Sequence, residues 1–165
     1  MMCPGVYMQQ YQTSRTRIIT GKKEQVMSGR REFKIGLLED NRFYNSLMRR
    51  QMERYTDEIA AERDIDFRIY AYTSPHDFLR NIPEDTNMAI VDYYLGEDVN
   101  GIYVLNAIFK KCSGCKVFII SNTGTIKTSL VTILEGASGF ILKDRHALSN
   151  ACYAVEDIMK SQGYL

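Results

Sequence analysis

The sequence predicts a single α/β domain in which a five-stranded parallel sheet lies between two layers of helices. Two observations predict this fold. Five short apolar runs alternate with longer segments in which apolar residues recur at the spacing of a helix. Four of these runs are apolar almost throughout, which is typical of parallel strands buried on both faces. The runs lie at 34–38, 67–72, 88–91, 116–120 and 139–142.

The second run has a different pattern from the other four. Its apolar residues alternate with charged and tyrosine side chains, as expected of a strand with one wetter face. We therefore expect it at the edge of the sheet. Phe67, Ile69 and Ala71 alternate there with Arg68, Tyr70 and Tyr72.

The segments between the runs are predicted to be helices. The second helix is short, and it follows Ser74-Pro75, where Ser74 can cap the helix and Pro75 fits its first turn. The other four each carry an apolar stripe of helical period. The stripes are Tyr44, Leu47, Met48, Met52 and Tyr55 in the first helix, Ile102, Leu105, Ile108 and Phe109 in the third, Ile126, Leu130, Ile133, Leu134 and Ala137 in the fourth, and Leu148, Ala151, Cys152, Val155, Ile158 and Met159 in the fifth.

Five alternating strands and helices should wind into a three-layer sandwich, because crossovers between parallel strands are right-handed. The common strand order for such a doubly wound sheet is 2-1-3-4-5. We assign residues 34–165 to this domain and residues 1–33 to a poorly ordered basic extension. Residues 1–34 carry a formal charge of +5, whereas residues 35–165 carry −4.

The bulk composition excludes several classes of protein. The mildly acidic domain argues against direct nucleic-acid binding, which needs clustered Lys and Arg. No apolar run approaches the roughly 20 residues that span a bilayer. The chain also begins without the apolar segment of a secretion signal, so we expect a cytoplasmic protein with no membrane contact. Cys112 and Cys115 form a lone pair in a loop and predict neither a zinc nor a redox site.

Polar residues follow four of the predicted strands. Because functional sites of doubly wound sheets lie at the carboxyl ends of the strands, these residues should converge. Taken singly, each is more simply explained as a turn residue, a helix cap or a solvated charge. Their joint occurrence after four different strands favours a site. The strand ends carry Glu39-Asp40, Asp92, Ser121-Asn122 and Lys143-Asp144.

The predicted cluster of carboxylates has a restricted chemistry. Two carboxylates about 4 Å apart repel by about 4 kcal/mol at an effective dielectric constant near 20. Either one of them is protonated or a cation lies among them. Carboxylate oxygens favour Mg²⁺, which keeps waters and leaves room for a phosphate. A carboxylate can also act as a nucleophile toward phosphorus and form an aspartyl phosphate.

The motifs that carry these residues resemble the receiver domain of two-component response regulators, of the chemotaxis-regulator type. The resemblance covers about residues 34–160 and implies a flavodoxin-like (βα)₅ fold. Each motif is weak alone, but their order and spacing are specific. The motifs are IGLLED at 35–40, AIVDYYLG at 89–96, VFIIS at 117–121 and GASGFILK at 136–143.

The resemblance implies a role for each matching residue. Asp92 would accept the phosphoryl group, and Ser121 and Lys143 would contact it. Asp40, Asp92 and the backbone carbonyl of Tyr94 would bind Mg²⁺, with Glu39 assisting. Ser121 and Phe140 would form the switch that reports phosphorylation.

The resemblance also implies partners and an output. A sensor histidine kinase or phosphotransfer protein would donate the phosphoryl group. A downstream protein, or an output domain of a longer regulator, would recognise the face of the fourth helix, fifth strand and fifth helix, which could also form a homodimer. The chain would be a signalling switch, and its only reactions would be Mg²⁺-dependent self-phosphorylation and autodephosphorylation.

Three features depart from the family pattern. Glu39-Asp40 replaces the commoner Asp-Asp pair, and Ser121 replaces the commoner Thr. Asp144 follows Lys143 where the family usually has Pro, often after a cis peptide bond. None of these changes removes a required chemical group.

Three alternatives remain at this point. An aspartate-nucleophile phosphohydrolase shares the strand-end Asp and Mg²⁺, but it usually has a second Asp two residues on, where this chain has Tyr94. A flavodoxin-like cofactor binder needs a phosphate loop after the first strand, where Glu39 and Asp40 would repel phosphate. A degenerate receiver would only dock to partners without phosphorylation.

Overall fold

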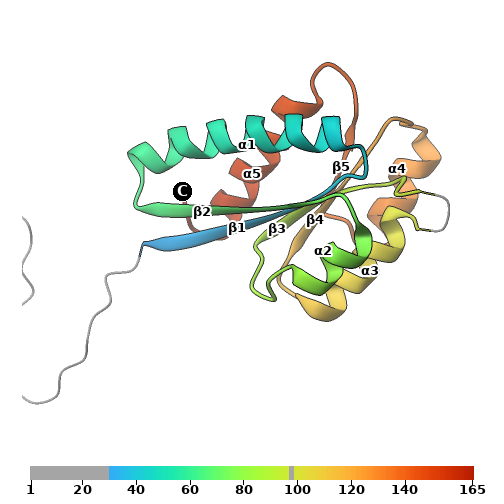
Figure 1. The fold of residues 1–165 in the computed structure, drawn as a ribbon, viewed down its shortest axis with the longest axis horizontal. Helices are drawn as coiled ribbons and strands as arrows, with labels where there is room; N and C mark the ends of the chain where they lie inside the picture. Colours follow the sequence, from blue (N-terminus) through green and yellow to red (C-terminus); the bar gives the residue numbers. More distant parts are fainter. Residues whose placement is uncertain (1–29, 97–98) are drawn as a thin grey trace, which may run out of the picture.

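The computed structural model describes residues 30–96 and 99–165 and has the predicted three-layer architecture (Figure 1). Five parallel strands form one sheet in the order β2-β1-β3-β4-β5. In the part of the chain described, no helix is both long and apolar enough to cross a membrane. The elements are β1 (Arg31–Leu38), α1 (Arg42–Glu62), β2 (Ile65–Tyr72), α2 (Pro75–Asn81), β3 (Met88–Asp92), α3 (Gly101–Lys111), β4 (Lys116–Ser121), α4 (Ile126–Leu134), β5 (Gly139–Leu142) and α5 (Ala147–Ser161).

Two apolar clusters hold the layers together, one on each face of the sheet. Successive residues of a strand point to opposite faces, so β3 contributes Met88 and Ile90 to one cluster and Ala89 and Val91 to the other. Helices α1 and α5 cover the first face, and α2 and α3 cover the second (Figure 1). This burial on both faces is why the central strands are apolar throughout.

The predicted elements agree with the structure except at particular boundaries and faces. Strand β1 begins three residues before the run at 34–38, because Phe33 is fully buried and its ring packs edge-on against Tyr164 near the chain end. Strand β2 is the edge strand and begins at Ile65. Ser74 caps α2 as predicted, by accepting a hydrogen bond from the Asp77 N–H. The described part of the chain contains no cis peptide bond.

Helix α4 does not bury the apolar stripe that its sequence carries. Leu130, Ile133 and Leu134 are 55%, 45% and 76% exposed. Of the α4 side chains that the structure describes, only that of Thr132 is fully buried, and its hydroxyl donates to the Ser129 carbonyl of its own helix. The periodicity therefore predicts the helix correctly, whereas these three apolar side chains are left largely exposed, and Ala137, just after the helix, is a buried member of the predicted stripe.

The cysteines after α3 are buried and free. Cys112 ends α3, and its thiol donates to the Thr86 carbonyl. Burial raises the pKa of the Cys115 thiol, which makes it unreactive. This environment fits two structural thiols.

The close approach of α3 to the end of β3 requires glycine at position 101. A Cβ built on Gly101 would lie 2.7 Å from the Asp92 carbonyl oxygen and 3.0 Å from the Tyr93 Cα. The Gly101 N–H donates to the Tyr93 carbonyl, which ties the first turn of α3 to the chain just after Asp92. The backbone around Asp92 is thus fixed by a contact that no other residue type allows.

Replacing Gly101 by Ala should force the backbone of β3 and α3 apart. We expect Gly101→Ala to lower the free energy of unfolding by about 1–3 kcal/mol, the usual cost of overpacking. Gly114→Ala is the matched control, because a Cβ at Gly114 meets nothing within 4 Å. Urea unfolding of both variants measures the difference, and equal stability of the two would contradict the role given to Gly101.

Candidate functional site

The candidate site lies at the carboxyl ends of the central strands, where three carboxylates meet. Glu39 follows β1, Asp40 comes next, and Asp92 is the last residue of β3. One carboxylate oxygen from each lies within 4.8 Å of the others. Glu39 and Asp92 are buried, and Asp40 is exposed. The adjacent pairing of β1 and β3 brings these distant residues together.

Lys143 completes the charged cluster. It follows β5, and its backbone N–H donates to the Ser121 carbonyl at the end of β4. Its Nζ lies 2.6 Å from Glu39 Oε2 and 2.7 Å from Asp92 Oδ2. The Lys143 side chain is only 6% exposed. One buried ammonium therefore bridges two buried carboxylates.

Local hydrogen bonds hold Glu39 in place. The Asn45 amide, buried on α1, donates to the Glu39 and Tyr72 carbonyls and so fastens the helix to the ends of β1 and β2. The Asn41 N–H donates to Glu39 Oε1, and the Asn41 side chain caps α1. The start of the helix thus fixes the direction of the Glu39 carboxylate.

Both oxygens of Asp92 have partners. Oδ1 accepts a hydrogen bond from the Tyr94 N–H at 3.3 Å, and Oδ2 accepts one from Lys143 Nζ. Burial raises the pKa of the Asp92 carboxyl, although the Lys143 ammonium opposes the shift. Burial likewise raises the pKa of the Glu39 carboxyl, again against the effect of Lys143. The protein therefore keeps two carboxylates where ionisation is costly without a cation.

The residues present fit a hard divalent cation. Glu39 Oε2 is buried and has no hydrogen-bond partner among the described residues, although Lys143 Nζ lies 2.6 Å away and compensates its charge. A bound cation would give this oxygen a second positive neighbour. Three carboxylates with an exposed member and an open pocket match the oxygen ligands and retained waters of Mg²⁺.

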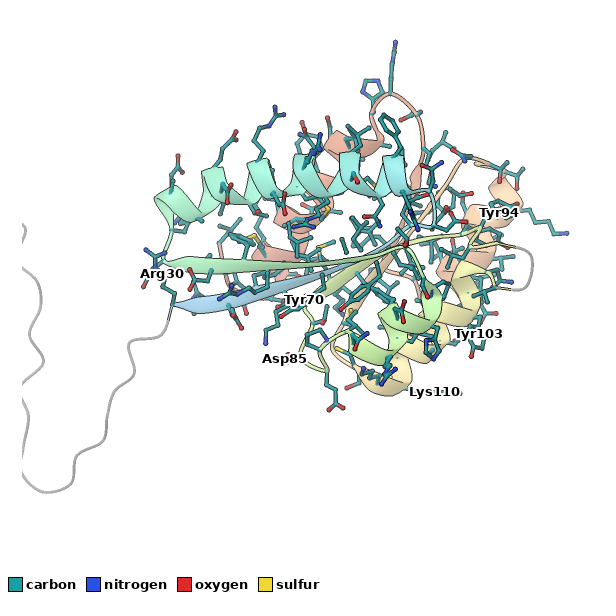
Figure 2. The ribbon with its side chains drawn as sticks, in the orientation of Figure 1. Arg30, Tyr70, Asp85, Tyr94, Tyr103 and Lys110 are labelled. Atoms are coloured by element: carbon teal, nitrogen blue, oxygen red, sulfur yellow. The ribbon has the colours of Figure 1, made fainter. Side chains whose placement is uncertain are left out.

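A shallow pocket of about 330 Å³ opens over the cluster. Asn41, Phe43, Tyr44, Tyr94 and Asn122 line it together with the carboxylates and Lys143. Tyr94, which is labelled in Figure 2, is 53% exposed, and the Thr123 hydroxyl donates to its OH at 3.3 Å. This hydrogen bond thus connects the loop after β3 to the loop after β4 at the rim of the pocket.

Tyr44 is a site residue that its sequence pattern does not reveal. Its spacing places it in the apolar stripe of the first helix, yet its ring lies beneath the Lys143 ammonium, 4.9 Å from Nζ. Burial and the nearby charge of Glu39 raise the pKa of Tyr44 to about 12. The ring therefore supports Lys143 from below through a cation–π contact.

For Ser121 and Phe140, no side-chain contact with the charged cluster is described. Ser121 ends β4 and is fully buried, and its hydroxyl lies 3.4 Å from that of Thr123. Phe140 on β5 is half-buried against the cluster of α2 and α3. The phosphoryl contact of Ser121, the switch role of Phe140 and the Tyr94 carbonyl ligand stay predictions.

Comparison with known proteins identifies the fold. No protein-family model matches the sequence, and no curated protein is similar to it. The beryllofluoride-activated DrrB receiver domain superposes with a TM-score of 0.62 at 13% identity, covering 78% of this chain and 98% of that one. A response-regulator receiver domain from Clostridium thermocellum gives 0.62 at 16% identity, with 80% and 98% coverage.

A third similar structure contains a modified aspartate. It is a response regulator from Burkholderia pseudomallei with a phosphorylated aspartic acid, a calcium ion and citrate, with a TM-score of 0.54, 15% identity and coverage of 76% and 71%. Many further similar structures are receiver domains, including one from Methanospirillum hungatei. This chain therefore has the flavodoxin-like (βα)₅ fold of response-regulator receiver domains.

Proposed function

We propose that this chain is a phosphorylation-dependent signalling switch in which Asp92 accepts a phosphoryl group. One observation carries the proposal: Asp92 ends β3 with its carboxylate against the Lys143 ammonium and within 4.8 Å of two other carboxylates. The fold is that of receiver domains, and one structure of that fold holds a phosphorylated aspartate. A phosphohistidine protein or a small phosphodonor would supply the group.

The reaction needs an ionised nucleophile and compensated charge. An oxygen of Asp92 attacks phosphorus, the bond from phosphorus to the donor nitrogen or oxygen breaks, and the leaving group takes the electron pair of that bond. Lys143 exchanges its contact with Asp92 Oδ2 for one with the phosphoryl oxygens. Glu39, Asp40 and Asp92 would hold Mg²⁺, which offsets the negative charge of the phosphoryl group in transfer.

The output would lie on the face of α4, β5 and α5. Phosphorylation of a side chain adds a charge of about −1.5 to −2, which attracts Lys143 and the Ser121 hydroxyl. Ser121 ends β4, which precedes α4, and Lys143 follows β5, which contains Phe140. Each of the three elements carries an exposed apolar side chain, Leu134 in α4, Leu142 in β5 and Tyr153 in α5, and a downstream protein or a second copy would bind there.

Removing the Asp92 nucleophile should abolish phosphorylation. We expect wild-type protein with Mg²⁺ and acetyl phosphate or phosphoramidate to gain the mass of one phosphoryl group, and Asp92→Asn to gain none. Intact-mass spectrometry and borohydride trapping measure the product. Asp85→Asn removes an exposed carboxylate before β3 and should behave as wild type. An unmodified but folded wild-type protein would favour a module that only docks.

Mg²⁺ affinity should fall as the pH is lowered. Protons compete for the same carboxylates, and because the pKa of Glu39 and that of Asp92 are raised, competition begins above the ordinary carboxyl range near 4. We expect the dissociation constant to rise up to about tenfold per pH unit for each carboxylate protonated. Calorimetric titrations between pH 8 and 5 measure it, and a constant affinity across this range would count against the proposed ligands.

Removing the bridging ammonium should destabilise the Mg²⁺-free protein. Lys143→Met leaves two buried carboxylates without a cation, which costs about 3 kcal/mol at pH 8. The loss should shrink as the pH falls through the raised pKa values, because protonation removes the buried charges. Added Mg²⁺ should restore stability in this variant but not when Asp40 is also changed to Asn. Thermal unfolding measures this, and an unchanged melting temperature at pH 8 would refute the bridge.

A further inference from the structure

A groove beside the edge strand β2 has no role in the proposed function. It has a volume of about 260 Å³ and lies between the second half of α1 and the outer side of β2. Its wall on α1 carries Glu53 and Asp57, and its floor carries Phe67 and Ile69, which α1 leaves half-buried. In the sheet as described, β2 pairs only with β1, so its other edge presents free backbone groups.

The charge of this groove is only partly compensated. Glu53 contacts Arg49 on its own helix. Asp57 is exposed, and no ion pair of it is described within residues 30–96 and 99–165. On the opposite face of β2, by contrast, Asp66 is paired with Arg30 and Arg68 with Glu32. The α1 side of the edge therefore suits an extended, basic segment.

The chain itself provides such a segment. Residues 15–20 read Arg-Thr-Arg-Ile-Ile-Thr, which combines two basic residues with four β-branched ones, the type that favours strands. Residues two apart in a strand point to the same side about 6.8 Å apart. Glu53 and Asp57, four apart on α1, are separated by about 6 Å along the helix. Arg15 and Arg17 thus match the spacing of the two acids.

Residues 21–29, which connect this segment to Arg30, are long enough and suitably placed for the segment to reach the outer edge of β2. The described chain begins at Arg30, which lies beside the start of β2 (Figure 2). Its guanidinium contacts Asp64 and Asp66. Residues 21–29 can span up to about 30 Å, whereas a strand added outside β2 would lie only two strand spacings, about 10 Å, from β1. A segment arriving this way would run antiparallel to β2.

We propose that residues 15–20 of this chain dock as an additional antiparallel strand on the outer edge of β2, with Arg15 and Arg17 facing Glu53 and Asp57. Main-chain hydrogen bonds supply the binding, as in other cases of strand addition. A second copy of β2 is a poorer occupant, because symmetric pairing would bring Asp57 toward the same acid of the other copy. Docking would also cover the exposed edge.

Hydrogen exchange of the full chain tests this docking. The β2 amides that point away from β1 should be protected in the wild-type protein. Arg15→Glu with Arg17→Glu should make them exchange about three- to tenfold faster, because attraction becomes repulsion at two surface ion pairs. Asp57→Lys should have the same effect, and combining it with the two Glu substitutions should recover part of the protection.

The controls separate this docking from a general effect of charge and from self-association. Glu58→Lys changes the same charge on the same helix outside the groove and should leave β2 exchange unchanged. Exchange unaffected by the Arg15 and Arg17 substitutions would overturn the proposal. Protection that disappears on dilution would identify a second copy as the occupant and overturn it as well. The measurement needs no Mg²⁺ or phosphodonor, so its outcome is independent of Asp92 phosphorylation.

Discussion

The structure depends on the contact of one buried ammonium, that of Lys143, with two buried carboxylates. Glu39 and Asp92 are buried at the ends of adjacent strands. Without a nearby cation, repulsion between the two carboxylates would favour protonation of one of them. The Lys143 ammonium offsets that repulsion, and it also makes a cation–π contact with the ring of Tyr44. Any metal or phosphoryl group entering the pocket must therefore compete with, or replace, an internal ion pair. In the resting site, the side chains are positioned by the same charges that the proposed chemistry would rearrange.

Much of the fold could be predicted from the sequence because the sheet is buried on both faces. Strands such as β3 cannot tolerate polar side chains until Asp92, so the apolar run and its polar end mark both the strand and the site. The common strand order 2-1-3-4-5 then predicts which strand ends are neighbours. That order predicts that Glu39, Asp40, Asp92 and Lys143 converge, and the structure places them in one cluster.

Features that depend on side-chain direction were not predictable. The period of α4 predicts a helix, but periodicity cannot say which side meets the sheet, and Thr132 is inside while Leu134 is outside. Tyr44 has the spacing of a core residue, and only the position of Lys143 shows that its ring supports a charge. The early start of β1 depends on contact between Phe33 and Tyr164, residues 131 positions apart in the sequence.

Helix α4 has an unusual consequence for local unfolding. Among the α4 side chains described, only a threonine bonded within the helix is fully buried and the apolar ones are partly exposed, so detaching these residues exposes less apolar area than detaching a fully buried stripe would. Its opening free energy should therefore lie well below that of global unfolding, in the range of cooperative units that open without loss of the core. A binding partner that covers Leu130 and Leu134 would bury apolar side chains that the domain by itself leaves exposed, and it would thereby stabilise this helix.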